Sequence, residues 1–269
     1  MKKRVALYFG SFNPVHRGHI ALTEWVVEQG LCDEAILIVS PQNPLKSCAE
    51  LAPEFSRFEM CELACAESKY PDRIKVSAIE FTLEKPSYTI NTLRFLRANF
   101  GSEMQFSILI GADNMAIFDR WVAHDEILRD YEIMVYPRSG YDNIKYPVGV
   151  HYLADAPIFD YAATEIRDAV GRGENIDDKV CPSVAKYIRE HNLWSPAMRI
   201  ANLNERIAAN PDDSALFTER GMWHFRMKEF DLAAADFRAA LAIDGGNKEA
   251  SEFLAITEET LRNGIIQHI

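Results

Sequence analysis

The chain has 269 residues, of which 48% are hydrophobic and 26% are charged, a composition that supplies one large core or two modest ones and excludes a disordered chain. The formal net charge is −11, and acidic residues outnumber basic residues both before and after residue 196. General nucleic-acid binders carry a basic excess, so this balance argues against a polynucleotide partner.

The cysteines and the N-terminal segment indicate in which cellular compartment the protein is expected. The five cysteines form no CxxC pair and are odd in number, which favours a reduced, cytoplasmic setting. Cys61 and Cys65 lie one turn apart on an expected helix, where buried structural thiols are the simpler interpretation than a metal pair. The apolar run after the basic N-terminal residues ends at Gly10–Pro14, so no membrane-spanning segment is expected.

Strand and helix patterns alternate through the first two thirds of the chain. The apolar runs predict buried strands at Val5–Phe9, Ala35–Val39, Phe106–Ile110 and Ile133–Tyr136, with shorter strands at Lys75–Ala78 and Val150–Leu153. Helices are predicted at His19–Gln29, Pro53–Glu67, Thr89–Asn99, His124–Arg129, from near Thr164, and at Ser183–His191. Gly30 and Gly101 are expected to terminate helices. This alternation predicts an α/β fold with a Rossmann-like, doubly wound parallel sheet.

The chain changes character after residue 196, so we expect one domain over residues 1–196 and a small all-α domain over 197–269. The second part is alanine-rich and helix-periodic. Turn clusters at 210–213 and 244–247 lie 34 positions apart, the period of a tetratricopeptide repeat. Phe217, Gly221, Ala233, Phe237 and Ala240 fall where that repeat packs its helices. A plain helical bundle is the alternative.

The segment from Arg4 to Ile20 carries the most specific chemistry. A buried strand runs into a turn at Gly10 and Ser11 and then into a helix, an arrangement that suits an anion at the helix N-terminus. His16 and His19 are three residues apart and are expected to share one face of that helix. Gly18 is expected to let a ligand approach the first helical turn closely.

These residues resemble the G-x-F-x-P-x-H-x-G-H signature of the HxGH nucleotidyltransferase superfamily, here Gly10, Phe12, Pro14, His16, Gly18 and His19. Later segments resemble, in order, the nicotinate mononucleotide adenylyltransferases of that superfamily. These segments are PQNPLK, PSYTINTLRFL, GADNMAIFDRW, YPRSGY and TEIR. The resemblance covers about residues 4–193 and implies transfer of an adenylyl group from ATP to nicotinate mononucleotide, with release of pyrophosphate.

The resemblance also implies roles for particular residues. His16 and His19 would contact the ATP phosphates, with main-chain N–H groups of Ser11 and Phe12 at the turn after Gly10. Lys46 and Arg167 would neutralise phosphate charge, and Thr164 would add a hydroxyl at a helix start. Asp113 and Gly111 would meet the ATP ribose. Mg²⁺ would arrive with ATP, because no cluster of His, Asp or Glu has metal-site spacing.

The mononucleotide is expected beside three further residues. Trp121 offers a stacking face for its ring, and Tyr88 and Thr89 begin a helix whose N–H groups suit its carboxylate. Each has an alternative: Tyr88 and Trp121 as packing residues, Asp113 as the cap of a helix starting at Asn114, and Lys46 as a solvated surface residue.

The chain departs from the family pattern at one place, and two rival functions stay open. The relatives usually read I-S-S-T-x-I-R, whereas this chain has Ala162 and Ala163 at the serine positions. The nearest rival is another HxGH transferase, acting on nicotinamide mononucleotide, phosphopantetheine, or a sugar or polyol phosphate. A second rival is a degenerate enzyme that acts as an interaction protein through its helical tail. A homo-oligomer or a protein partner, bound through the C-terminal helices, is also left open.

Overall fold

The computed structural model describes residues 1–41, 51–141, 146–159 and 161–266, and these divide into two compact units. The first comprises Met1–Arg167 and Ile176–Glu190, and the second comprises Asp168–Asn175 and His191–Ile269. Packing therefore groups 168–175 with the helical tail, although composition changes only near residue 196. No helix in the described part of the chain combines the length and apolarity needed to cross a membrane.

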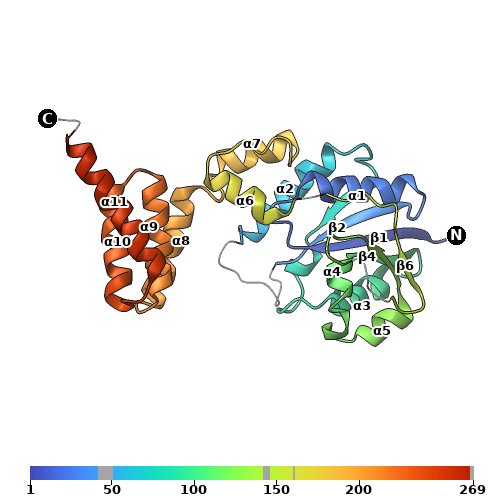
Figure 1. The fold of residues 1–269 in the computed structure, drawn as a ribbon. Coiled ribbons are helices and arrows are strands. Elements are labelled where there is room, and N and C mark those ends of the chain that lie inside the picture. The colour runs from blue at the N-terminus through green and yellow to red at the C-terminus, as the bar shows by residue number, and fades with distance from the viewer. Residues whose placement is uncertain (42–50, 142–145, 160, 267–269) are drawn as a thin grey trace. The chain divides into compact units, whose positions relative to one another are not determined.

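The first unit is built on a six-stranded parallel sheet with the strand order β3-β2-β1-β4-β5-β6 (Figure 1). The strands are β1 (Lys3–Gly10), β2 (Glu34–Val39), β3 (Ile74–Ser77), β4 (Met104–Gly111), β5 (Glu132–Tyr136) and β6 (Val150–Tyr152). β1 pairs with β2 on one side and with β4 on the other, so the strand order reverses between β1 and β4. The doubly wound prediction and all six predicted strands are confirmed.

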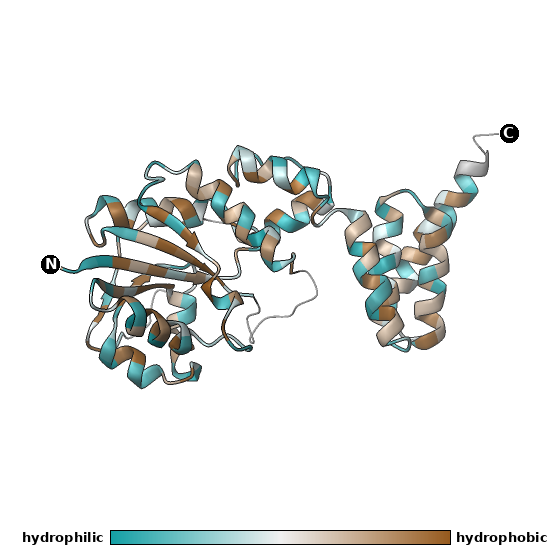
Figure 2. Ribbon diagram, turned by 180° about the vertical axis from the view of Figure 1, so that it is seen from behind, coloured by the Kyte–Doolittle hydropathy of each residue, from teal (hydrophilic) through white to brown (hydrophobic). Residues whose placement is uncertain are grey.

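Helices cover both faces of this sheet, with α1 and α2 on one side and α3 and α5 on the other (Figure 1). Their bounds are α1 (Arg17–Glu28), α2 (Glu54–Ala66), α3 (Thr89–Phe100), α4 (Ala112–Met115), α5 (His124–Asp130), α6 (Ala163–Gly171) and α7 (Pro182–Glu190). Two short 3₁₀ helices, η1 (Ile79–Phe81) and η2 (Phe118–Arg120), complete the unit. The strands are largely hydrophobic along their length, as burial on both faces requires (Figure 2).

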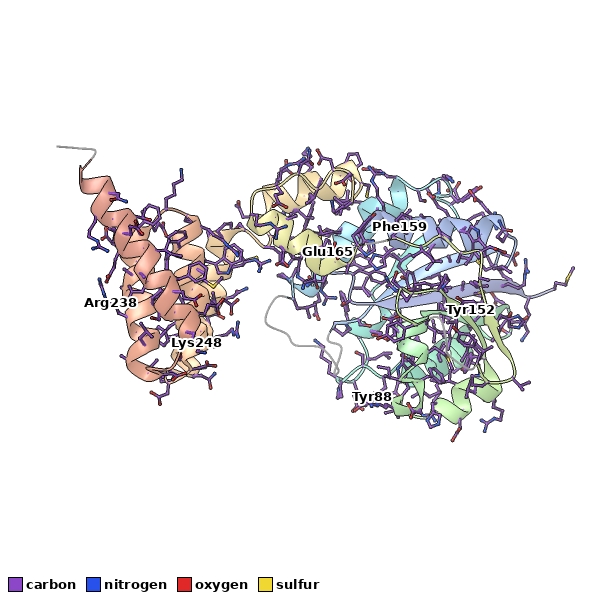
Figure 3. All side chains as sticks on the ribbon, viewed as in Figure 1. Tyr88, Tyr152, Phe159, Glu165, Arg238 and Lys248 are labelled. Atoms are coloured by element: carbon purple, nitrogen blue, oxygen red, sulfur yellow. The ribbon has the colours of Figure 1, made fainter. Side chains whose placement is uncertain are left out.

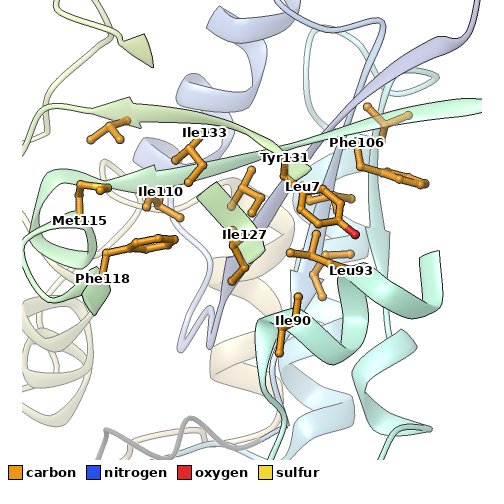
Figure 4. Packing of buried hydrophobic residues seen from close by; sticks show 14 of the residues in the cluster. Leu7, Ile90, Leu93, Phe106, Ile110, Met115, Phe118, Ile127, Tyr131 and Ile133 are labelled. Atoms are coloured by element: carbon orange, nitrogen blue, oxygen red, sulfur yellow. The ribbon is translucent and has the colours of Figure 1, made fainter. Parts of the chain in front are cut away.

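A core cluster lies between the sheet and α3 and α5 (Figure 4). Leu7 of β1 and Ile108 of β4 are fully buried there, as are Leu93 of α3 and Ile127 of α5. This packing fixes the carboxyl ends of β1 and β4, from which the candidate site is built.

Several element boundaries differ from those predicted. The first helix begins at Arg17 instead of His19, and His16 is its N-cap. α4 begins at Ala112 with Gly111 as N-cap, so the alternative that Asp113 caps a helix starting at Asn114 is wrong. Gly30 has φ +64°, as expected of a helix terminator, whereas Gly101 stays in the right-handed region at φ −66°.

The second unit is helical after residue 195, with α8 (Pro196–Ala209), α9 (Ser214–Arg226), α10 (Phe230–Ile243) and α11 (Lys248–Ile266). Gly221 of α9 lies against the ring of Phe237, where an added Cβ would come within 2.7 Å of that ring. Ala233 and Ala240, on the same helix as Phe237, are also fully buried. The expectation that small residues mark close helix contacts is confirmed, while the repeat assignment stays a prediction.

Candidate active site

A cavity of about 810 Å³ opens at the carboxyl ends of β1 and β4, where the strand order reverses. Ligands of open α/β sheets bind at such a point. Every predicted site residue that the structure describes lines this cavity, namely Gly10, Ser11, Phe12, His16, His19, Tyr88, Thr89, Gly111, Asp113, Trp121, Thr164 and Arg167. The remaining predicted residue, Lys46, lies outside the described residues. The placement is therefore as expected, and the individual roles remain predictions.

The two histidines form a stacked pair at the start of α1. Their ring centroids are 3.6 Å apart with an interplanar angle of 30°. The main-chain N–H of His16 donates to Nδ1 of His19 over 3.1 Å. An acceptor at Nδ1 places the proton of a neutral ring on Nε2, so His19 carries a donor at its other nitrogen.

His16 is buried, and its environment keeps the ring neutral. Burial and, secondarily, the charge of Arg138 lower the pKa of His16 to about 3. Gly18 explains part of this burial, because a Cβ there would come within 3.0 Å of the His16 ring and 3.1 Å of Phe159. Gly18 also lines a small cavity beside the histidine pair, so the expectation that a ligand approaches the first helical turn here stays a prediction.

Arg167 connects α6 to the turn after β1. Its Nη1 donates to the carbonyl of Asn13 over 3.0 Å, and its Nη2 donates to Oγ1 of Thr164 over 3.1 Å. α6 begins one residue before Thr164, so both side chains lie in its first two turns. The guanidinium is thus held at the rim of the cavity by the segment that carries the histidines.

The three residues expected beside the mononucleotide also line this cavity. Tyr88 is the N-cap of α3 and is 37% exposed, and Thr89 is the first residue of that helix (Figure 3). Trp121 packs on Phe118 with 5.1 Å between ring centroids and still lines the cavity. Trp121 therefore serves the core and the cavity wall together.

Asp113 faces Arg138 across the end of β4. Its Oδ1 lies 3.7 Å from Nε of Arg138, and both atoms are buried without a hydrogen-bond partner. Gly111 permits this arrangement, because a Cβ there would fall 2.2 Å from the Asp113 carboxylate. Buried polar atoms normally have a hydrogen-bond partner, so this pair is a candidate contact for a polar ligand in the cavity.

A smaller cavity of about 270 Å³ adjoins the histidine pair. His16, His19 and Arg138 line both cavities. Its other walls include Leu22, Pro157, Ile158, Phe159, Tyr161 and Glu165. The Tyr161 ring meets the His16 ring edge-on, 5.4 Å between centroids.

Sequence reasoning missed three residues of this region. Arg138 lies in the YPRSGY segment, to which we assigned no role, and its Nη2 donates to the hydroxyl of Tyr136 over 3.2 Å. That hydroxyl lies 2.9 Å from the hydroxyl of Tyr8. Glu80 is a buried carboxylate in the cavity wall, and Arg57 is a buried cation beneath the turn at Ser11. A charged residue on a half-apolar segment is ordinarily interpreted as solvent-exposed. The burial of Glu80 and Arg57 therefore becomes visible only in the folded structure.

The described residues hold no group of three or more His, Cys, Asp or Glu side chains that could bind a metal ion. Cys61 and Cys65 are buried in α2, and burial raises the pKa of the Cys65 thiol to about 12. The burial of Cys61 and Cys65 matches the expectation of structural thiols.

A doubly wound parallel sheet with a cavity at its switch point is an architecture that binds nucleotides, and comparison with known families identifies the class as nucleotidyltransferase. Residues 7–169 match the family model described as cytidylyltransferase-like. The solved structure of Plasmodium falciparum nicotinic acid mononucleotide adenylyltransferase complexed with NaAD has the same fold. Its TM-score is 0.61 at 15% identity, over 71% of this chain and 97% of that one.

Relatives with higher sequence identity identify the family more closely. A protein of Bacteroides fragilis named "probable nicotinate-nucleotide adenylyltransferase" is 41% identical over 189 residues, covering 70% of this chain and 92% of the relative. A protein of Porphyromonas gingivalis with the same name is 40% identical over 172 residues, covering 63% of this chain and 85% of the relative. The chain therefore belongs to the nicotinate-nucleotide adenylyltransferase family.

Proposed function

We propose that this protein transfers the adenylyl group of ATP to nicotinate mononucleotide, giving nicotinate adenine dinucleotide and pyrophosphate in NAD biosynthesis. The observation that carries the proposal is one cavity that gathers the histidine pair, Arg167, the start of α3 and Trp121. The names of the relatives and the NaAD complex of the Plasmodium enzyme support the same substrates.

The reaction calls for alignment and charge stabilisation more than for a protein nucleophile. An oxygen of the mononucleotide phosphate attacks the α-phosphorus of ATP. The bond from that phosphorus to the α,β-bridging oxygen breaks, and the electron pair leaves on pyrophosphate. Mg²⁺ enters as part of the MgATP substrate and is held largely by phosphate and water.

The histidine pair supplies donors where negative charge grows. His19 accepts at Nδ1, so its Nε2–H is the donor for a phosphate oxygen. His16 enters the reaction neutral, which leaves it a hydrogen-bond donor without a fixed charge. Arg167 and Thr164 would complete the phosphate contacts from α6. Ala162 and Ala163 cannot donate side-chain hydrogen bonds there, so the main chain of α6 would take a larger share.

The mononucleotide would lie between Trp121 and the start of α3. The free N–H groups and positive dipole end of α3 stabilise a carboxylate, whereas they offer no acceptor to an amide NH₂. We therefore expect a higher kcat/KM for nicotinate mononucleotide than for nicotinamide mononucleotide.

Pyrophosphate release with ATP, Mg²⁺ and each candidate acceptor tests the proposal. We expect release with nicotinate mononucleotide in preference to nicotinamide mononucleotide and phosphopantetheine. Preference for another acceptor would show that nicotinate mononucleotide is not the substrate. Absence of pyrophosphate release with every acceptor would favour the degenerate interaction protein.

For residues 197–269 we propose a tetratricopeptide-like domain joined to a transferase domain over residues 1–196. The sequence supports one repeat and a half, the half being marked by Leu203 and Ile207, which precede Phe237 and Leu241 by 34 positions. So short an array cannot cover its own apolar faces, so we expect it to pack on its own chain, on a second copy or on a protein partner. A cytoplasmic location remains the expectation from the cysteines.

A further inference from the structure

Arg57 is a fully buried cation directly beneath the phosphate-binding turn. It lies on α2, and its exposed fraction is 0%. Its guanidinium donates four hydrogen bonds to main-chain carbonyls: to Ala52 from Nε over 2.9 Å, to Ser11 and Ser40 from Nη1 over 2.7 Å each, and to Pro41 from Nη2 over 2.8 Å. Burial lowers the pKa of Arg57 to about 10, so the group stays protonated at neutral pH.

The four carbonyls belong to three segments that meet at the cavity. Ser11 lies in the turn after β1, Ser40 and Pro41 follow β2, and Ala52 precedes α2. A second contact reinforces the arrangement, because the side-chain oxygen of Asn13 accepts the N–H of Ala52 over 3.0 Å. One side chain therefore fixes the turn relative to the end of β2 and the start of α2.

The turn held in this way contains a strained residue. Phe12 has φ 44°, in the left-handed region that non-glycine residues rarely adopt. Such a residue is strained and persists only where surrounding contacts determine the backbone. The bond from Arg57 to the preceding carbonyl is a contact of that kind.

The same bond sets the polarity of the turn. In a planar trans peptide the carbonyl and the N–H point in opposite directions. Arg57 donates a hydrogen bond to the carbonyl of Ser11, so the N–H of Phe12 points away from Arg57. A flip of this peptide would exchange the two groups, and a carbonyl oxygen facing a phosphate would repel it. Ser11 and Phe12 both line the larger cavity, where polyphosphate is expected.

We propose that Arg57 is a positioning residue for the transfer reaction, which holds the Ser11–Phe12 peptide in the orientation that binds polyphosphate. The assignment rests on the proposed function for the identity of the polyphosphate. It adds a group that does not touch substrate but decides whether the turn presents a donor or an acceptor.

Arg57→Lys tests this, because a lysine keeps the cation but lacks the planar fork that reaches several carbonyls at once. The binding of inorganic tripolyphosphate and of MgATP is measured by calorimetry, well below the melting temperature, together with kcat and each KM. We expect at least about tenfold weaker binding of both polyphosphates, a loss of about 1.4 kcal/mol. Affinity for nicotinate mononucleotide should change less than about twofold.

Arg73→Lys is the matched control. Arg73 also donates to two main-chain carbonyls, those of Asp33 over 2.8 Å and Cys32 over 3.2 Å, next to the amino end of β2. A purely structural role predicts that both variants lower the melting temperature and leave polyphosphate affinity unchanged, and that result overturns the proposal. Arg57→Gln, which retains N–H donors, is made alongside. If neither Arg57 variant folds while Arg73→Lys does, Arg57 is structural and the proposal is also overturned.

Tripolyphosphate separates this inference from the proposed function. A wild-type protein that binds tripolyphosphate but transfers no adenylyl group contradicts the function and leaves the binding test of Arg57 decisive. A wild-type protein that binds no polyphosphate contradicts both.

Discussion

The ring of His16 stacks on the ring of His19 with 3.6 Å between centroids, and His19 accepts the main-chain N–H of His16 at Nδ1. The two rings are therefore not equivalent. His16 is the buried member, held neutral by its surroundings, whereas His19 is oriented by a hydrogen bond that leaves Nε2–H as its donor. The main burden of transition-state stabilisation should accordingly fall on His19.

His19→Ala should lower kcat by about 100- to 1,000-fold, the usual cost of one lost donor to developing charge. Steady-state pyrophosphate release measures the loss, and thermal unfolding serves as the control for folding. Turnover within a few-fold of wild type in a folded variant would remove His19 from the mechanism.

His16 should make the protein sensitive to mild acid. Its pKa is about 3 when folded and about 6.5 when unfolded, so between these values the unfolded state binds more protons. Stability is then retained above pH 6.5 and falls as the pH drops through this window, by up to about 1.4 kcal/mol for each pH unit. His16→Asn should lose less stability than wild type between neutral pH and pH 4.5, measured by urea unfolding. Parallel losses would show that His16 is not the titrating group.

Trp121→Ala should raise the KM for nicotinate mononucleotide more than the KM for ATP, because the indole lines the end of the cavity that is expected to take the pyridine ring. Trp121→Phe keeps a stacking face and the contact with Phe118, and should stay close to wild type. Equal increases in both KM values for Trp121→Ala would indicate a general packing role instead.

Glu80→Gln should stabilise the protein at neutral pH. Burial raises the pKa of Glu80, although Thr92 donates to its Oε1 over 2.8 Å. The folded state therefore binds the proton more tightly than the unfolded state, and stability falls as the pH rises through the interval between the two pKa values. The neutral amide avoids this loss, so its advantage in urea unfolding should be present at pH 7.5 and absent near pH 4. The exposed Glu84→Gln is the control, and an advantage independent of pH would contradict the interpretation.

The sequence predicts the strands and the helices because each depends on a local pattern, and the family resemblance adds some of the residues that line the larger cavity. The run from Val5 to Phe9 is apolar and is followed by Gly10 and His16, which is enough to place a strand, a turn and an anion site. Arg57 is different: it lies on an amphipathic helix, and its four acceptors come from three other segments. No spacing rule relates those segments, so its role becomes visible only when the chain is folded. The packing of Phe159 near Gly18 escapes prediction for the same reason, because Phe159 comes from a distant part of the chain.

The helical tail should be dispensable for the chemistry. The described residues that line the larger cavity all lie between Tyr8 and Arg167. The family model matches residues 7–169, which precede the tail. The family's activity is therefore expected to reside in the matched part.

Removing residues 197–269 should still have a measurable effect, because Asp168–Asn175 belong to the same compact unit as the tail. Arg199 forms an ion pair with Asp168 over 3.1 Å, and an added Cβ on Gly171 would lie within 2.7 Å of Trp223. The truncation removes both contacts and exposes the second half of α6, immediately after Arg167. We expect lower solubility or altered association, seen by light scattering, with kcat/KM kept within about tenfold of wild type. A folded, monodisperse truncation without activity would show that the tail completes or positions the site.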